Sequence, residues 1–147
     1  MANELIYTTG SQLTLQSSGA SATSSAFPST SASIAASAMS AYTGLDLVLT
    51  ASMSGAVSSA SNYFACYARP MDIDGTNDAP IPSAAYRGGF VGTFVMASSS
   101  AAGQQTMFLP DVPVSWAALE FYLENLTNSS VAAGWTLKAT PKTVKPL

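Results

Sequence analysis

Charged side chains, histidine and paired cysteines are scarce or missing in this sequence. Only 9% of its 147 residues are charged, it contains no histidine, and its single cysteine is Cys66. Without histidine, a Ser-His-Asp triad is excluded, and a catalytic cysteine would lack the usual group that helps to form its thiolate. One cysteine can form neither an intrachain disulfide nor a CxxC motif. We expect no enzyme, and we interpret Cys66 as a small buried hydrophobic residue.

Long apolar runs and a basic surface are missing as well. No stretch approaches 18 consecutive apolar residues, and the opening Met-Ala-Asn-Glu-Leu-Ile lacks the positive and apolar regions of a signal peptide. The net charge of −3 argues against nucleic acid as a partner, and we expect Lys138, Lys142 and Lys145 to be solvated. These features predict synthesis in a cytoplasm, with neither a membrane nor nucleic acid as partner.

The balance of apolar and charged residues predicts a surface that is covered by other subunits. Hydrophobic residues make up 48% of the chain, whereas charged residues are far below the roughly one quarter that is usual in soluble domains. An isolated small domain with so little charge would tend to associate. We therefore interpret the chain as a building block that buries much of its exterior against partners, itself included.

Alternation of apolar and polar residues with a period of two dominates the chain and predicts β-strands. In residues 46–53, for example, the leucines share one face and the polar side chains the other. Residues 90–96 are apolar on both faces, which is typical of a central strand. The other strands are predicted at 62–69, 118–124 and 135–140, with shorter ones at 5–8, 12–17 and 106–109.

One of these predictions involves a choice between strand and helix. Residues 115–124 also fit a helix, because Trp116, Leu119 and Leu123 would share one stripe, but Phe121 and Tyr122 would then lie on other faces, so we favour a strand. The polar run after this strand predicts a turn, so that 118–124 and 135–140 would form a hairpin-like pair.

The pattern as a whole predicts an all-β fold. Seven or eight short strands separated by Gly, Pro, Asn and Ser indicate an antiparallel β-sandwich, either a jelly roll or an immunoglobulin-like sandwich without the Cys-Trp-Cys signature. We expect one domain, 1–147, with a short N-terminal arm at 1–9. The Ser/Ala-rich segment 17–43 is predicted to be a loop followed by a small strand or short helix; alternatively, it orders only in an assembly.

An aspartate-rich loop offers the nearest approach to a metal site. Asp72, Asp74 and Asp78 carry oxygen ligands of the kind calcium prefers, but the spacing does not match an EF-hand. We favour a turn in which these side chains bond to their own backbone, with Gly75 at positive φ. We also expect one of Arg69 and Arg87 to pair with an aspartate of this loop.

The outward face of the predicted strands supplies candidate contact residues. Tyr63, Tyr67 and Tyr122 fall on faces opposite the apolar positions and are the interface candidates, whereas catalytic and cofactor-binding residues are not expected. Glu120 and Glu124 would be about 13 Å apart on a strand, which is too far for a glycosidase pair, so we expect solvated or interface charges.

The sequence resembles small virion proteins of tailed bacteriophages, most closely the capsid cement, or decoration, proteins. The stretches that carry the resemblance are LTLQSSG at 13–19, YARPMDIDGTNDAPIPS at 67–83, YR at 86–87, FVG at 90–92, FYLEN at 121–125 and AGWTLKATPK at 133–142. The resemblance implies a jelly roll without catalytic residues that binds the major capsid protein on the virion surface as a homodimer or homotrimer, after assembly in the cytoplasm of a bacterial host. The alternatives are a tail or head-fibre module that binds a host receptor or glycan, a free carbohydrate-binding domain, and an enzyme built on the aspartate-rich loop with a bound metal. For a decoration protein, we expect the N-terminal arm at 1–9 and one uncharged sheet face to contact the shell or a sister subunit.

Overall fold

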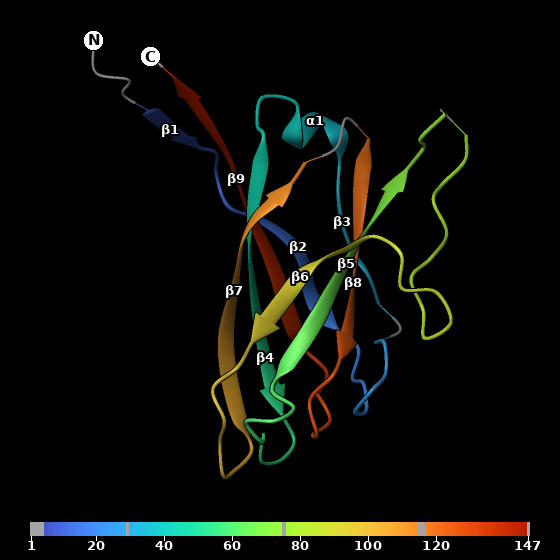
Figure 1. The fold of residues 1–147 in the computed structure, drawn as a ribbon, viewed down its shortest axis with the longest axis vertical. Helices are drawn as coiled ribbons and strands as arrows, with labels where there is room; N and C mark the ends of the chain where they lie inside the picture. The colour runs from blue at the N-terminus through green and yellow to red at the C-terminus, as the bar shows by residue number, and fades with distance from the viewer. Residues whose placement is uncertain (1–4, 29, 75, 115–116, 147) are drawn as a thin grey trace.

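Two antiparallel sheets packed face to face make up the fold (Figure 1). The computed structural model describes residues 5–28, 30–74, 76–114 and 117–146. The predicted all-β sandwich is confirmed, with nine strands and one short helix in these residues. The elements are β1 (Leu5–Thr9), β2 (Leu13–Gly19), β3 (Ala32–Ile34), α1 (Ala36–Met39), β4 (Gly44–Met53), β5 (Tyr63–Met71), β6 (Phe90–Val95), β7 (Gly103–Pro113), β8 (Ala118–Asn125) and β9 (Trp135–Pro146).

The long strand β9 organises the first sheet. One of its edges pairs with β4, which in turn pairs with β7. Its other edge is shared by two strands, since β2 pairs with residues 135–139 and β1 with residues 142–146. The second sheet has the order β3-β8-β5-β6. In Figure 1, β1 and the end of β9 extend together beyond the body of the sandwich.

The core lies between the sheets and follows from the alternation in the strands. Leu45, Leu47 and Leu49 of β4 are completely buried and face Phe64 and Phe121 of the second sheet within one apolar cluster. Burying each leucine side chain contributes about 1.5–3 kcal/mol. Cys66 is completely buried in the same cluster, as predicted, and burial raises the pKa of its thiol.

Strand β8 confirms the choice of strand over helix, but its predicted partner is wrong. It pairs with β5 and β3, whereas β9 pairs with strands of the first sheet. The chain between them crosses from one sheet to the other. The buried Asn125 fixes this crossing, because its amide donates to the carbonyls of Thr23 and Ser129 at 3.1 and 2.8 Å.

Strand β6 is an edge strand, so the prediction of a central position is wrong. It pairs only with β5 among the described strands, and Phe90 and Val95 are exposed on its outer side. The apolar residues on its second face therefore belong to the surface and not to a second buried layer.

The Ser/Ala-rich segment is ordered by a few larger residues. A loop is followed by both β3 and α1, in agreement with the predicted loop and small element. Ile34 and Met39 are buried in the core, and the small residues Ala22 and Ala32 are buried in the same cluster. Small residues here therefore let the backbone lie close to the sandwich.

Candidate interaction surface

The three candidate tyrosines lie on β5 and β8, on the outer side of the second sheet. Tyr67 and Tyr122 are register partners across the two strands. Tyr67 is only 3% exposed, so the prediction that it faces outward to a partner is wrong. The rings of Phe27 and Phe90 cover it, at centroid distances of 5.6 and 5.7 Å. Tyr63 and Tyr122 are half-buried.

Beneath this cover, a buried carboxylate is held by an arginine from the segment between β5 and β6. Arg87 donates to Glu124 through Nε at 3.0 Å and Nη2 at 2.6 Å, and the Tyr67 hydroxyl donates to the same carboxylate at 2.8 Å. Glu124 is completely buried, so the expectation of a solvated or interface charge is wrong. The hydrogen bonds from Arg87 lower the pKa of Glu124, whereas burial and the bond to Glu124 raise the pKa of Tyr67 to about 12.

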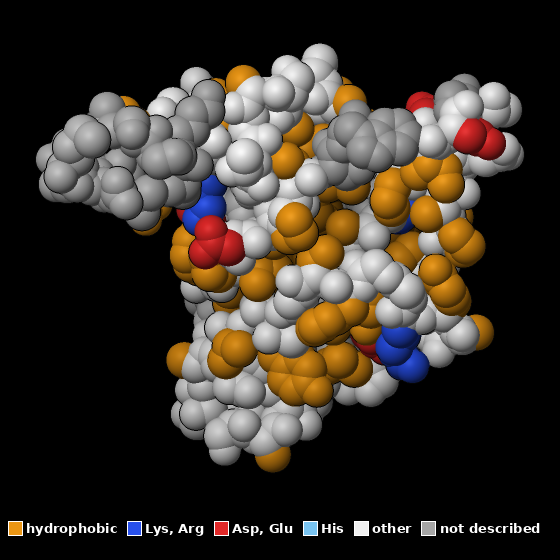
Figure 2. Space-filling view, turned by 45° about the horizontal axis from the view of Figure 1, so that its top comes forward, with side chains coloured by type: hydrophobic (Ala, Val, Ile, Leu, Met, Phe, Trp, Pro, Cys, Tyr) orange, Lys and Arg blue, Asp and Glu red, His pale blue; other side chains and the backbone are white. Residues whose placement is uncertain are grey.

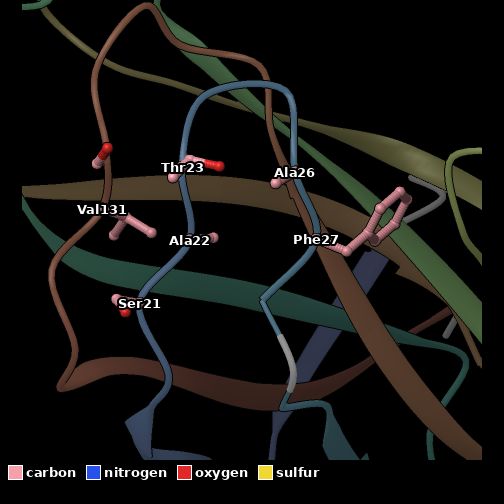
Figure 3. Close-up of a pocket in the computed structure, with 7 residues that line it drawn as sticks. Ser21, Ala22, Thr23, Ala26, Phe27 and Val131 are labelled. Carbon is pink, nitrogen blue, oxygen red and sulfur yellow. The ribbon is translucent and has the colours of Figure 1, made fainter.

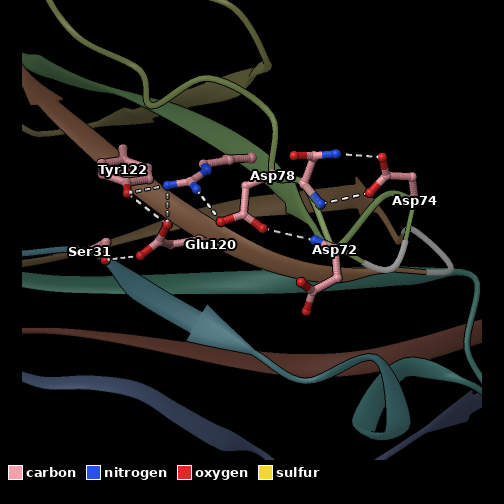
Figure 4. A network of polar contacts seen from close by, with 8 residues as sticks. Ser31, Asp72, Asp74, Asp78, Glu120 and Tyr122 are labelled. Carbon is pink, nitrogen blue, oxygen red and sulfur yellow. Dashed lines mark hydrogen bonds and ion pairs between the residues drawn. The ribbon is translucent and has the colours of Figure 1, made fainter.

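A second network ties the aspartate-rich loop to the sheet (Figure 4). Arg69 donates to Glu120 at 3.1 Å and to Asp78 at 2.5 Å, which confirms the expected pairing of an arginine with this loop. Glu120 also accepts bonds from the hydroxyls of Tyr122 and Ser31, at 2.7 and 2.5 Å. Burial, followed by the bond to Glu120, raises the pKa of Tyr122. Glu120 is therefore a structural charge and not a free one.

The aspartates of the loop bond to the backbone, as predicted. Asp74 accepts bonds from the Asn77 backbone and amide and from the Thr76 backbone, and these bonds lower its pKa (Figure 4). Asp78 accepts a bond from the backbone of Asp72, itself at φ 53°. The prediction for Gly75 lies outside the described residues. No three metal-ligating side chains converge anywhere in the described part of the chain.

A third ion-pair group lies where β1 and β9 leave the body. The Lys142 ammonium is 2.5 Å from Asp46 and 2.7 Å from Asp111, so the prediction that Lys142 is solvated is wrong. Hydrogen bonds to Asp111 and Asp46 raise its pKa. Lys142 is also the register partner of both Thr9 and Gly44, so this group fixes the point at which the sheet narrows to two strands.

Most of the charged side chains that the structure describes take part in ion pairs of this kind. Of the charged side chains that the structure describes, only Lys138, Asp72 and Asp74 have no ion-pair partner. The outer faces of both sheets are consequently almost free of unpaired charge. Burying such a surface against a partner leaves few charges without a counter-charge, which is the costliest case.

Exposed apolar side chains occur where the sequence patterns did not predict an interface. Ile81, Tyr86 and Phe90, which we call the 81–90 patch, are exposed on the segment that covers the second sheet. Arg87 lies within this segment with its side chain 53% exposed. Figure 2 shows hydrophobic side chains gathered beside basic groups on this side of the molecule. The position of Ile81 between two prolines, which disfavour a central strand, was a signal for exposure.

A shallow pocket lies beside this surface, between the loop 21–27 and residues 130–131 (Figure 3). Its volume is about 500 Å³. The lining consists of hydroxyl, methyl and aromatic groups, namely Ser21, Ala22, Thr23, Ala26, Phe27, Ser130 and Val131. These groups offer hydrogen bonds and apolar contact but no acid or base for catalysis.

Comparison with known proteins gives no function for this surface. The chain gives no match to a protein-family model, a curated protein sequence or a solved structure. No helix in the described residues is long and apolar enough to cross a membrane.

Proposed function

We propose that this chain is a non-catalytic virion subunit, a decoration protein that binds the outer surface of a bacteriophage head and stabilises the shell. The sequence resemblance introduces this function, and the observation that carries it is the surface almost free of unpaired charge. The charged residues connect covering segments to the sandwich, while Ile81, Tyr86 and Phe90 remain exposed. Aromatic residues and arginine are enriched where protein interfaces are buried, and unpaired charges are depleted there.

The order of the strands supports the finer assignment of a jelly roll. When β1 is set aside, the sheets read β2-β9-β4-β7 and β3-β8-β5-β6. Successive strands from β2 to β5 therefore alternate between the sheets, as do β6 to β9, and the two sets interleave as in a double Greek key. We include this fold in the proposal because the decoration proteins that the sequence resembles share it.

Binding to the shell is assigned to the 81–90 patch. This segment is held on the sandwich by the Arg87–Glu124 and Arg69–Asp78 pairs, so its apolar side chains are presented on a fixed base. A preorganised surface loses less conformational entropy on binding.

The test is the copy number of the chain in purified particles, measured by quantitative mass spectrometry against the major shell protein. A ratio within a few-fold of one is expected for a shell-covering subunit. A ratio of a few per hundred would favour a tail or fibre part, and absence from particles would refute a virion role. In the same particles, Ile81→Lys is expected to reduce occupancy, whereas Phe108→Lys, which changes an exposed residue of the other sheet, is not.

A further inference from the structure

The outer edge of β1 is an unpaired strand edge. Strand β1 pairs with β9 through five register positions, from Leu5↔Pro146 to Thr9↔Lys142. No described residue pairs with its other edge, because β2 joins β9 and not β1. Beyond Lys142, β9 also has no partner on its second edge among the described strands, since β4 begins at Gly44. The two strands thus form a ribbon, and an isolated two-stranded ribbon is only marginally stable in water.

The other sheet edges are interrupted in ways that prevent pairing with another chain. Strand β3 has three residues, and β2 has two register shifts. Strand β6 contains a register shift beside Gly92, which has φ 153°, and β7 contains Pro110, Pro113 and Asp111 at φ 58°. Short strands, bulges and prolines are the usual means by which proteins block their edges.

Strand β1 has none of these features. Its sequence, Leu-Ile-Tyr-Thr-Thr, lacks charge, proline and glycine and consists largely of strong β-formers. Tyr7 is 70% exposed, and Ile6 is exposed as well. The ribbon extends beyond the body of the sandwich (Figure 1). The edge of β1 therefore carries none of the features that block pairing with another chain.

We propose that β1 pairs antiparallel with β1 of a second copy of this chain, about a two-fold axis at Tyr7. The unpaired end of β9 beyond Lys142 carries Lys145 and Pro146, and charge and proline are further features that block an edge. Among the described edges of a second copy, β1 is therefore the one that is not blocked, so the contact is isologous. Tyr7 is the middle residue of the strand, which places Tyr7 opposite its copy and Ile6 opposite Thr8. No like charges oppose each other in this register. The first sheets of the two copies then join into one continuous sheet.

The contact between the two β1 strands is small, so we expect the dimer to be weak. Five paired residues bury less than the roughly 800 Å² per partner of a standard stable interface. We therefore expect a dimer that dissociates on dilution and that is favoured where copies are concentrated side by side. This inference concerns the isolated chain and does not depend on binding to a shell.

The experiment is sedimentation velocity of the purified chain over a range of concentrations. The native chain is expected to shift from monomer to dimer as concentration rises. Tyr7→Lys places two positive charges opposite each other and is expected to remain monomeric with an unchanged melting temperature, because Tyr7 is largely exposed. Phe108→Lys is the matched control, since it exchanges an aromatic residue that is 56% exposed on another edge strand, and it should still dimerise.

Cysteine crosslinking tests the register. Paired Cα atoms in antiparallel strands lie about 4.5–5.5 Å apart, within the range of a disulfide. Tyr7→Cys should therefore form a disulfide-linked dimer on oxidation, whereas Thr8→Cys, which is out of register with its own copy, should not. The native Cys66 is completely buried and does not compete. A native chain that stays monomeric at all concentrations, a Tyr7→Lys variant that still dimerises, or crosslinking only through Thr8→Cys would overturn the proposal.

Discussion

Replacing Arg87 with methionine would leave a buried carboxylate without its cationic partner. Glu124 is completely buried and accepts three hydrogen bonds shorter than 3.1 Å, two from Arg87 and one from Tyr67. Methionine retains much of the apolar stem of arginine but supplies no donor. The variant therefore removes the ion pair while it keeps most of the apolar contacts of the residue 87 side chain.

The size of the effect follows from the burial of the two partners. Removing one partner of a fully buried ion pair costs about 3–5 kcal/mol, because the other charge stays behind unpaired. Since the Arg87 side chain is 53% exposed, water can enter where the guanidinium lay and reduce this penalty. We expect a loss of about 2–3 kcal/mol in the free energy of unfolding at pH 7. For a chain of this size, that corresponds to a fall in Tm of roughly 5–10 °C.

The pH dependence distinguishes the charge from general damage. The lowered pKa of Glu124 means that its contribution to stability is present above the ordinary glutamate pKa and is lost as pH falls through the lowered folded value. In Arg87→Met, burial without a cation raises that pKa, so the carboxyl binds a proton and the deficit shrinks towards acidic pH.

Urea unfolding at pH 7 and at about pH 4, close to the ordinary glutamate pKa, would measure the stability deficit of Arg87→Met and its decrease at acidic pH. Lys138→Met, which removes a lysine without an ion-pair partner among the described residues, should change stability by no more than about 0.5 kcal/mol. A deficit in Arg87→Met that is equally large at both pH values would refute the reasoning.

Three further results are expected. The pKa of Tyr67, raised to about 12, predicts that stability falls as pH rises from about 10, the ordinary tyrosine value, towards 12, and that Tyr67→Phe weakens this dependence in urea unfolding. A Cβ at Gly19 would lie 1.8 Å from Cε2 of Trp135, so Gly19→Ala should cost at least about 1–3 kcal/mol, whereas Gly103→Ala, with nothing within 4 Å of its Cβ, should be nearly neutral by thermal unfolding. Removal of residues 1–9 should lower occupancy on particles, and unchanged occupancy would exclude the arm from shell binding.

Sequence alternation predicted the strands well because it reports a local property. Leu47, Leu49 and Ala51 recur at every second position regardless of which strand lies beside them, so the position and inner face of β4 were predictable. Which strands pair was not predictable, since it depends on contacts distant in sequence. Strands β8 and β9 follow each other in the chain, yet the crossing fixed by the buried Asn125 amide places them in different sheets.

For the candidate surface, too, the sequence predicted which face of a strand a residue occupies but not which distant residues contact it. Alternation placed Tyr67 correctly on the face of β5 opposite the core, but it could not predict that Phe27 and Phe90 cover that face. The partner of Glu124 is Arg87, 37 positions away, and the spacing within β8 contains no sign of it. An outer face was therefore predicted to be exposed, although residues from an earlier and a later segment of the chain cover it.

The scarcity of charge and the covering of the second sheet have a common physical basis. With so few ionisable residues, the chain uses most of them where they are paired: Arg69 and Arg87 hold the segment between β5 and β6 on the sheet, and Lys142 holds the start of the ribbon. Each pair neutralises two opposite charges at the same time as it fixes a segment. The remaining surface is apolar or hydroxyl-bearing and can be buried with little loss of hydration. The same property lowers the electrostatic repulsion that keeps free subunits apart, so solubility of the isolated chain should improve when exposed sites such as Phe108 are changed to charged residues.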